Sequence, residues 1–404
     1  MPKKNNAKIK KKILPKQLPR IYMDYAAATP VDLRVAKMVT ARLPEVFANS
    51  MSFHSFGQAA REVLEQSRAD IAGIINANPK EIIFTGSATE SNNLALKGVM
   101  FANKNRGKHL IISPIEHACV MESSEWLERQ GFEVTQLKVD NFGLVNPAEV
   151  AAAIRPDTVL VSVMHANNEI GTIEPIAEIG KICREKGVCF HTDAAQTFGK
   201  IAIDVKKMNI DLLTASSQKI YGTKGAACLF VREGLRIEPI LHGGGQESGM
   251  RSSTVNVPAI YSFAQAGKLS QKEMAKESKR LAALRDKLIA GILKNIPGAH
   301  LNGHPTKRLP GNANIWFEFV EGESMIIQLD LNGIAASTGS ACSSAKLAPS
   351  HVLLAIGLQA QEAHGSLRLS LGRWSKANEV NYVLKVLPKI IARLREISPF
   401  KTAY

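Results

Sequence analysis

The stretch VCFHTDAAQTFGK, residues 188–200, starts as a short apolar run and becomes polar at Asp193. Such a run is typical of a buried strand, and Asp193 then stands at its carboxyl-terminal tip. A carboxylate buried there needs a partner, because an unpaired buried charge is costly in free energy. The partner is either a protonated heterocyclic nitrogen of a ligand or a nearby Lys or Arg, and this stretch alone leaves both open.

Similar apolar runs lie on either side of this stretch, at EIIF (81–84), LIIS (110–113), TVLVSVM (158–164), DLLTAS (211–216) and CLFV (228–231). Helical patterns that end in Gly separate several of them, as in ESSEWLERQG (122–131) and EIGKICREKG (178–187). This alternation predicts an α/β fold with a mostly parallel central sheet and helices on both faces. Ligands of such sheets bind at the carboxyl ends of the strands.

The pattern changes near residue 271. Apolar residues then recur at helical spacing, at Met274, Leu281, Leu284, Leu288 and Ile292. They are followed by NANIWFEF (312–319), a helix-like ESMIIQLDLNG (323–333) and SLRLSLG (366–372). We therefore predict a large domain over residues 21–270 and a smaller α/β domain over residues 271–404.

Residues 1–20 form a basic tail with seven Lys, one Arg and no acidic residue, and they supply eight of the net +15 charges of the chain. We expect a disordered, solubilising arm. An arm that attracts an acidic protein or RNA stays open as an alternative.

The bulk composition is that of a soluble globular protein, with 45% hydrophobic and 22% charged residues. No apolar run approaches the length of a membrane span. The cysteine count is odd, at five, and no C-x-x-C pair occurs, which argues against a disulfide framework or a structural zinc site. We expect a protein of a reducing compartment, the cytoplasm, without membrane partners.

Two further motifs stand at predicted strand ends. In FTGSATESNNLAL (84–96), a helix opens near Thr89 after Gly and Ser, which suits phosphate binding but equally a routine N-cap by Ser87 or Thr89. In TASSQKIYGTKG (214–225), Lys219 follows a strand directly. A buried lysine there would be a nucleophile toward carbonyls, whereas a surface lysine would have no such role.

The order of these motifs, together with SPIEHACV (113–120), HANNEIG (165–171), HGGGQESGMRSST (242–254), STGSACSSAKLAPSHVLLAIGL (337–358) and AHGSLRLSLGR (363–373), resembles the cysteine desulfurase family. These are pyridoxal 5′-phosphate (PLP) enzymes of fold type I in the class V aminotransferase group. The resemblance covers nearly the whole chain after the tail. It implies L-cysteine as substrate and a homodimer.

The resemblance also assigns roles to single residues. Lys219 would form the imine with PLP, Asp193 would pair with the pyridine nitrogen, and His117 would stack on the ring and move protons. Arg368 would clamp the substrate carboxylate, as a bidentate donor can, with Asn168 nearby. Asn168 and Gln196 would contact the phenolic oxygen of the ring. Thr254 would reach the phosphate of the neighbouring subunit. The remaining phosphate contacts would come from Ala88, Thr89, Ser216, Ser217 and Gln218.

Cys342, in STGSACSSA (337–345), matches the cysteine that accepts sulfur in the family. It would become a persulfide while alanine is released, on a loop of the longer, mobile type, and it would pass the sulfur to an acceptor protein. The acceptor would serve iron–sulfur cluster assembly or tRNA thiolation. The resemblance implies no resident metal, although Cys342 would be an iron–sulfur ligand transiently during transfer. The other four cysteines are expected to pack as small hydrophobes.

The chain departs from the family pattern at four positions: Gln218 replaces the usual His, Thr223 the usual Pro, Ser248 the usual Arg and Ser253 the usual Gly. Two rival functions therefore stay open. One is another class V PLP reaction, such as that of a selenocysteine lyase or an aminotransferase. The other is a basic carrier or RNA-associated scaffold without catalysis, although direct nucleic-acid binding is not what we expect.

Overall fold

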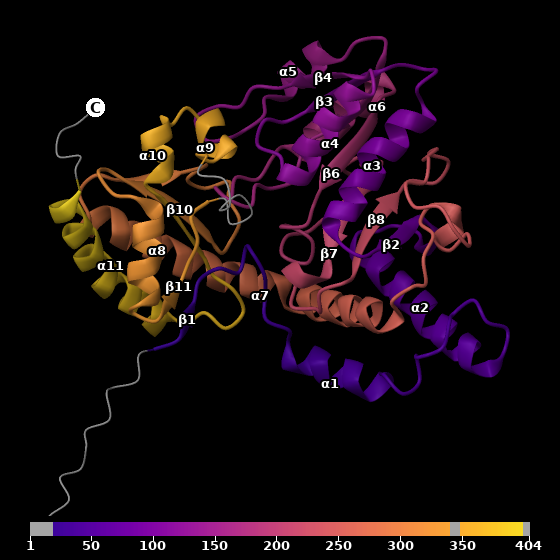
Figure 1. The fold of residues 1–404 in the computed structure, drawn as a ribbon, viewed down its shortest axis with the longest axis horizontal. Helices are drawn as coiled ribbons and strands as arrows, with labels where there is room; N and C mark the ends of the chain where they lie inside the picture. The colour runs from indigo at the N-terminus through magenta and orange to yellow at the C-terminus, as the bar shows by residue number, and fades with distance from the viewer. Residues whose placement is uncertain (1–18, 340–347, 399–404) are drawn as a thin grey trace, which may run out of the picture.

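The computed structural model describes residues 19–339 and 348–398. Its largest element is a seven-stranded sheet (Figure 1). The strands lie in the order β2 (Ile82–Thr85), β8 (Ala227–Val231), β7 (Leu212–Ser216), β6 (Cys189–Asp193), β5 (Thr158–Ser162), β3 (His109–Ile112) and β4 (Glu133–Gln136). Only β8 runs against its neighbours, and the other pairings within this sheet are parallel. The predicted mostly parallel sheet is confirmed.

Helices cover both faces of this sheet. Successive residues of a strand point to opposite sides, and here both sides are apolar and need to be buried. Ile83 packs with one helical layer, whereas its neighbours Ile82 and Phe84 pack with the other. The first layer contains α3 (Ala88–Ala102) and α4 (Ala118–Arg129). The second contains α2 (Ser55–Ile74), α6 (Ile176–Lys186), the short α5 (Pro147–Ala153) and the start of α7 (Val257–Asn295).

The smaller domain has its own antiparallel sheet, ordered β12 (Ser366–Ser370), β10 (Asn312–Phe317) and β9 (Ala299–Asn302). Helices α8 (Gly322–Asp330) and α11 (Ala377–Ile397) pack with it into a separate apolar core. The short helices α9 (His351–Ala355) and α10 (Ala360–His364) lie at its edge facing the large domain (Figure 1). The prediction of a smaller C-terminal α/β domain is confirmed.

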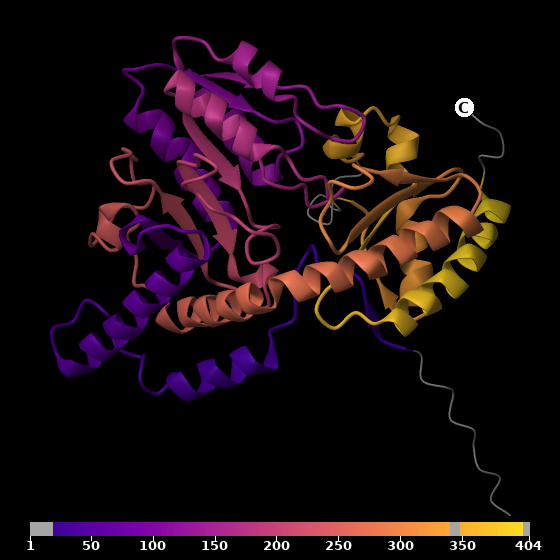
Figure 2. The ribbon, with the colours of Figure 1, turned by 180° about the vertical axis from the view of Figure 1, so that it is seen from behind.

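Two features connect the two domains. Helix α7 runs unbroken beneath both domains, so the expected boundary at residue 270 falls inside a helix (Figure 2). The helix also starts earlier than its amphipathic pattern after residue 271 predicted. In addition, β1 (Ile21–Tyr22) pairs in parallel with β11 (Ile334–Ala335) of the small domain, whereas α1 (Leu33–Arg42), which follows it, packs with the large one. The division at residue 270 stays a prediction.

Three short 3-10 turns complete the described elements, at η1 (Pro79–Glu81), η2 (Ser217–Lys219) and η3 (Glu247–Gly249). None of the helices in the described ranges is both long and apolar enough to span a membrane.

Candidate active site

The predicted site residues gather at one edge of the large sheet. Strands β2, β3, β5, β6 and β7 run in the same direction, so their carboxyl ends share that edge. Thr85, Asp193 and Ser216 are the last residues of three of these strands. This is where ligands of parallel sheets are bound.

Asp193 is buried at the tip of β6 and accepts two hydrogen bonds. Its Oδ1 accepts from the backbone N–H of Ala195 at 2.8 Å, and its Oδ2 accepts from Asn92 Nδ2 at 2.7 Å. Within the described ranges no Lys or Arg forms an ion pair with it, so the alternative of a simple ion pair is wrong there. The carboxylate is held by neutral donors and can still receive a protonated nitrogen.

His117 lies at the N-cap of α4, where its Nδ1 accepts from the backbone N–H of Cys119 at 3.1 Å. The neutral ring therefore carries its proton on Nε2. Burial lowers the pKa of His117 below the usual value, while the nearby Asp193 raises it and Lys219 lowers it. The three predicted groups thus lie within electrostatic reach of one another, and the imidazole is neutral at neutral pH.

Lys219 ends η2, the turn that follows β7. Its Nζ donates to the backbone carbonyls of Ala26 at 2.8 Å and Ala27 at 2.6 Å. The amine therefore points into the segment between the two domains, where backbone oxygens hold it. The alternative of a lysine extended into solvent is wrong.

Helix α3 begins at Ala88, close to the predicted Thr89. Ser87 is the capping residue, because its hydroxyl accepts from the Glu90 N–H at 3.1 Å. The cap leaves the N–H groups of Ala88 and Thr89 at the positive end of a 15-residue helix. The capping and phosphate hypotheses are therefore compatible, and these two amides can hold an anion.

The Ser-rich turn follows β7, a strand whose Leu212 packs in the same apolar cluster as α3. Ser216 and Ser217 are buried at the end of β7, and Gln218 is half-buried. The Gln218 carbonyl accepts from the N–H and the hydroxyl of Thr29, at 3.0 and 2.9 Å. The Ser217 hydroxyl has no hydrogen-bond partner within the described ranges.

Arg368, on β12, connects the small domain to the site. Its guanidinium pairs with Asp24 at 2.9 Å and donates to the carbonyls of Asn168 and Gly339, each at 3.1 Å. The structure thus brings together Arg368 and Asn168, the two residues predicted to meet the substrate. Its Nε has no partner within the described ranges, so the buried fork still has donor capacity for a carboxylate.

Three of the predicted residues do not point into the group of side chains described above or cannot be placed there. The Gln196 amide is engaged on the side of the N-terminal segment, with Nε2 donating to the Ala26 carbonyl at 3.0 Å and Oε1 accepting from Lys200 at 3.4 Å. Thr254 is exposed before α7, where a second subunit could reach it. Cys342 lies outside the described residues.

Sequence reasoning missed two neighbours of these groups. Asn92 was quoted only as part of the α3 motif, yet it contacts both Asp193 and, at 3.1 Å, the Cys119 thiol. Cys119 was expected only to pack, but its sulfur lies 3.1 Å from His117 Nδ1. Burial raises the pKa of Cys119 to about 12, so this thiol stays protonated and is no nucleophile. The three remaining described cysteines are buried, as expected.

Comparison with known proteins agrees with this geometry. The family model described as "Aminotransferase class-V" matches residues 21–383. The chain belongs to this family. Its relatives include a cysteine desulfurase IscS of Methanosarcina thermophila, 49% identical over 94% of both chains, and cysteine desulfurase IscS 1 of Archaeoglobus fulgidus, 50% identical over 94% of this chain and 98% of that one. The resemblance to cysteine desulfurases is confirmed; its longer-loop type stays a prediction.

Solved structures show the same fold. A NifS-like protein has a TM-score of 0.87 at 36% identity, covering 93% of this chain and all of that chain. A structure described as "SspA in complex with cysteine" has a TM-score of 0.77 at 37% identity, covering 87% and 98%. The fold-type prediction is therefore confirmed.

As a member of this family, the chain belongs to a PLP-dependent class of enzymes, and its residues fit that cofactor. The carboxylate of Asp193 suits a pyridinium nitrogen, the amine of Lys219 suits a carbonyl, and the free amides of α3 suit a phosphate. One ligand with a basic ring nitrogen, an aldehyde and a phosphate would match all three groups.

Proposed function

We propose that this protein is a PLP-dependent cysteine desulfurase that transfers the sulfur of L-cysteine to Cys342 and releases L-alanine. The observation that carries the proposal is the joint placement of Asp193, His117 and Lys219 at the carboxyl edge of the sheet. Arg368 of the small domain joins this edge through its contact with the Asn168 carbonyl. Relatives named cysteine desulfurase support the choice of reaction over other class V chemistry.

The bound cofactor supplies an electron sink that weakens bonds to the substrate's α-carbon. The chain's own groups do the rest. Arg368 holds the substrate carboxylate, and Lys219 carries the proton that leaves the α-carbon. His117, neutral and buried, exchanges protons beside the substrate. Asp193 would pair with the ring nitrogen of the bound cofactor and keep it protonated.

Sulfur transfer itself involves the Cys342 thiolate as nucleophile. It attacks the sulfur of the bound L-cysteine, so that an S–S bond forms and the substrate's Cβ–S bond breaks. The electron pair of that bond stays with the carbon skeleton, which takes up protons and leaves as alanine. A nucleophile of an acceptor protein of iron–sulfur assembly or tRNA thiolation then takes the outer sulfur of the persulfide, so that the S–S bond breaks and the Cys342 thiolate is restored.

The proposal includes a homodimer in which Thr254 reaches the partner's phosphate site. Thr254 is exposed in the single chain. Large apolar side chains also lie exposed around α1 and the start of α2, at Leu33 (82%), Phe47 (71%), Phe53 (94%) and Phe56 (60%). Apolar groups gathered in this way mark protein–protein contacts.

The test is an intact mass of the PLP-loaded protein after brief exposure to L-cysteine, with peptide mapping and alanine measured in parallel. We expect one added sulfur on Cys342 and release of alanine. Cys342→Ala should keep the absorption band of bound PLP and gain no sulfur. A PLP-loaded protein that gains no sulfur and yields no alanine would instead favour another class V reaction. A protein that binds no PLP would favour the scaffold.

A further inference from the structure

The turn that carries Lys219 is held by the side chain of Thr29, a residue with no role in the site described above. The Thr29 hydroxyl donates to the backbone carbonyl of Gln218 at 2.9 Å and accepts from the backbone N–H of Tyr221 at 2.8 Å. Gln218 directly precedes Lys219, and Tyr221 follows it by two residues. One hydroxyl therefore fastens the turn on both sides of the lysine.

A hydroxyl is the group suited to both contacts. The Gln218 carbonyl needs a donor and the Tyr221 N–H needs an acceptor, and the hydroxyl of Ser or Thr supplies both from a single atom. The N–H of Thr29 adds a second bond to the same carbonyl, at 3.0 Å. The next residue is Pro30, which favours an extended backbone at Thr29. A constrained backbone thus presents this hydroxyl to the turn.

The backbone of Tyr221 is strained, and Thr29 is one of the groups that hold it. Its φ is +72°, in the left-handed region that bulky residues rarely adopt. Such a conformation persists only where its surroundings fix it. The Tyr221 carbonyl accepts from the Asp32 N–H at 2.9 Å, and its hydroxyl accepts from the Arg373 N–H at 2.8 Å. Strain this close to Lys219 indicates a turn whose shape serves the site.

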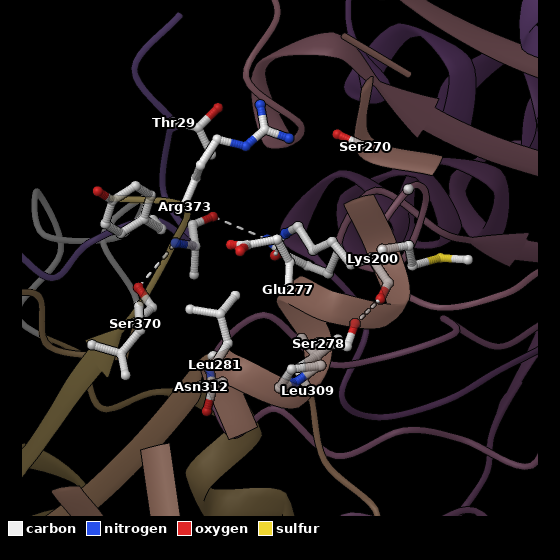
Figure 3. A pocket seen from close by; sticks show the side chains of 18 of the residues that line it. Thr29, Lys200, Ser270, Glu277, Ser278, Leu281, Leu309, Asn312, Ser370 and Arg373 are labelled. Carbon is white, nitrogen blue, oxygen red and sulfur yellow. Dashed lines mark hydrogen bonds between the residues drawn. The ribbon is translucent and has the colours of Figure 1, made fainter. Parts of the chain in front are cut away.

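The groups that hold the turn come from both domains. Thr29, Tyr221 and Arg373 line the same cavity, in which Thr29 and Arg373 are labelled in Figure 3. Arg373 follows β12 of the small domain, and the carbon of its guanidinium lies 4.3 Å from the centroid of the Tyr221 ring. The same guanidinium pairs with Glu273 of α7 at 3.0 Å. The turn is therefore fixed to the helix and the strand that connect the domains.

Lys219 has two kinds of anchor, and a carbonyl ligand affects them differently. At the tip of the side chain, the carbonyls of Ala26 and Ala27 accept from the amine. An imine nitrogen carries at most one hydrogen, so it cannot keep both contacts after the amine has joined an aldehyde. The bonds of Thr29 involve only the backbone on either side of Lys219 and do not depend on the state of the amine.

We propose that Thr29 is a positioning residue, whose hydroxyl fixes the Lys219 turn so that the amine meets the aldehyde of PLP in a productive orientation. Orientation of a reacting group is a major contribution to rate in an enzyme site. The proposal rests on the proposed function only in taking Lys219 as the residue that binds PLP. It requires neither L-cysteine nor Cys342.

The test is the rate at which the full-length apoprotein captures PLP, followed by the absorption band of the imine. Thr29→Val removes the hydroxyl and keeps the branched shape, so capture should slow about tenfold or more. Thr29→Ser keeps a hydroxyl and should stay within about twofold of the parent. Thr223→Val is the matched control, because the Thr223 hydroxyl has no hydrogen-bond partner in the described part of the chain. Its capture rate should also stay within about twofold.

Pyridoxine 5′-phosphate separates positioning from a general structural role. It has the ring nitrogen and the phosphate of PLP but no aldehyde, so its binding reports these contacts without the imine. Its affinity for Thr29→Val, measured by calorimetric titration of the apoprotein, should stay within about twofold of the parent value. A general defect of the fold should instead weaken this analogue and slow PLP capture together.

If Thr29→Val does not fold, Thr29→Ala removes the hydroxyl with less bulk and should slow capture to the same extent. The proposal is overturned if the folded variant captures PLP as fast as the parent, or if Thr29→Ser or Thr223→Val is as slow as Thr29→Val. It is also overturned if affinity for the analogue falls in step with capture, or if the parent forms no imine. A parent that captures PLP but adds no sulfur to Cys342 contradicts the desulfurase function alone.

Discussion

Asn92 and Asp193, 101 residues apart in the chain, are joined by a buried hydrogen bond of 2.7 Å from Nδ2 to Oδ2. This bond fixes the carboxylate that is proposed to meet the pyridine nitrogen of PLP. Asn92→Ala removes this donor, so that only the Ala195 N–H still orients Asp193. We expect PLP affinity to fall by about tenfold or more, the effect of losing one hydrogen bond to a charged group. Titration of the apoprotein with PLP, followed by absorbance, measures it.

Asn93→Ala is the matched control on the same helix. The Asn93 amide donates to the Thr89 carbonyl and does not contact Asp193. The PLP affinity of the Asn93→Ala variant should stay within about twofold of that of the parent protein. Equal losses in both variants would mean that α3 as a whole, and not the Asn92–Asp193 contact, sets the affinity.

A second prediction concerns a buried ion pair beneath the phosphate-type turn. Arg68 donates to both carboxylate oxygens of Glu247, at 2.7 and 2.8 Å, and the Phe84 N–H donates to the same carboxylate at 2.7 Å. Glu247→Gln leaves the buried guanidinium with only the exposed Glu65 as counter-charge. We expect a loss of about 3 kcal/mol in the free energy of unfolding, measured by urea denaturation.

Glu65→Gln tests the same arginine from its exposed side. Glu65 also pairs with Arg68, at 3.1 Å, but its side chain is 52% exposed. Such a pair contributes under about 0.5 kcal/mol. The contrast between the two variants, rather than either value alone, checks that burial sets the effect. Similar small losses for both would contradict it.

Stability should decline as the pH rises from about 5 to about 8, because of a buried carboxyl group. Burial raises the pKa of Glu116 to about 8, although the Ser113 hydroxyl and the Met164 N–H donate to its Oε1. The folded state then holds a proton that the unfolded state has lost above its ordinary pKa. This contribution is complete at low pH and is lost as the pH rises through about 8, at up to about 1.4 kcal/mol per pH unit.

Glu116→Gln keeps a neutral side chain of the same shape at every pH. The gap in unfolding free energy between this variant and the parent should therefore widen in the variant's favour from pH 7 to pH 9. Other titrating groups cancel in that difference. Glu125→Gln, on the exposed side of α4, should show no such change. A gap that stays constant with pH would mean that Glu116 is ionised at pH 7.

The sequence was most informative where a signal is local. The apolar runs around Asp193 predicted six of the seven strands of the large sheet, because buried parallel strands are continuous in their hydrophobicity. Strand β4 was missed, since Glu133 and Gln136 are exposed at the sheet edge and break the apolar run. The full length of α7 was missed because its first half packs under the sheet and lacks a one-sided pattern.

The sequence predicted the charged groups of the site but not the side chains that hydrogen-bond to them. Lys219 and Asp193 follow strands directly, and a strand tip can be seen in the sequence. Asn92 acts through Asp193, a partner 101 residues away that the fold brings to it. No local pattern encodes such a contact, so only the three-dimensional arrangement reveals it.

The departure at Thr223 has a structural reason, and it supplies a last prediction. The Thr223 N–H donates to the hydroxyl of Ser262, a fully buried residue of α7, at 2.9 Å. A proline, which the resemblance implies at this position, has no N–H and cannot make this bond. Thr223→Pro should therefore lower the free energy of unfolding by about 1 kcal/mol.

Thr223→Ala separates this bond from the side chain. The Thr223 hydroxyl has no hydrogen-bond partner within the described ranges, so alanine keeps the N–H bond and should cost less than about 0.5 kcal/mol. Ser262→Ala removes the acceptor instead. Because both Thr223→Pro and Ser262→Ala break one bond, the double variant should lose less than the sum of the single losses. Strictly additive losses in urea denaturation would show that the two residues act independently and that the N–H bond does not explain the threonine.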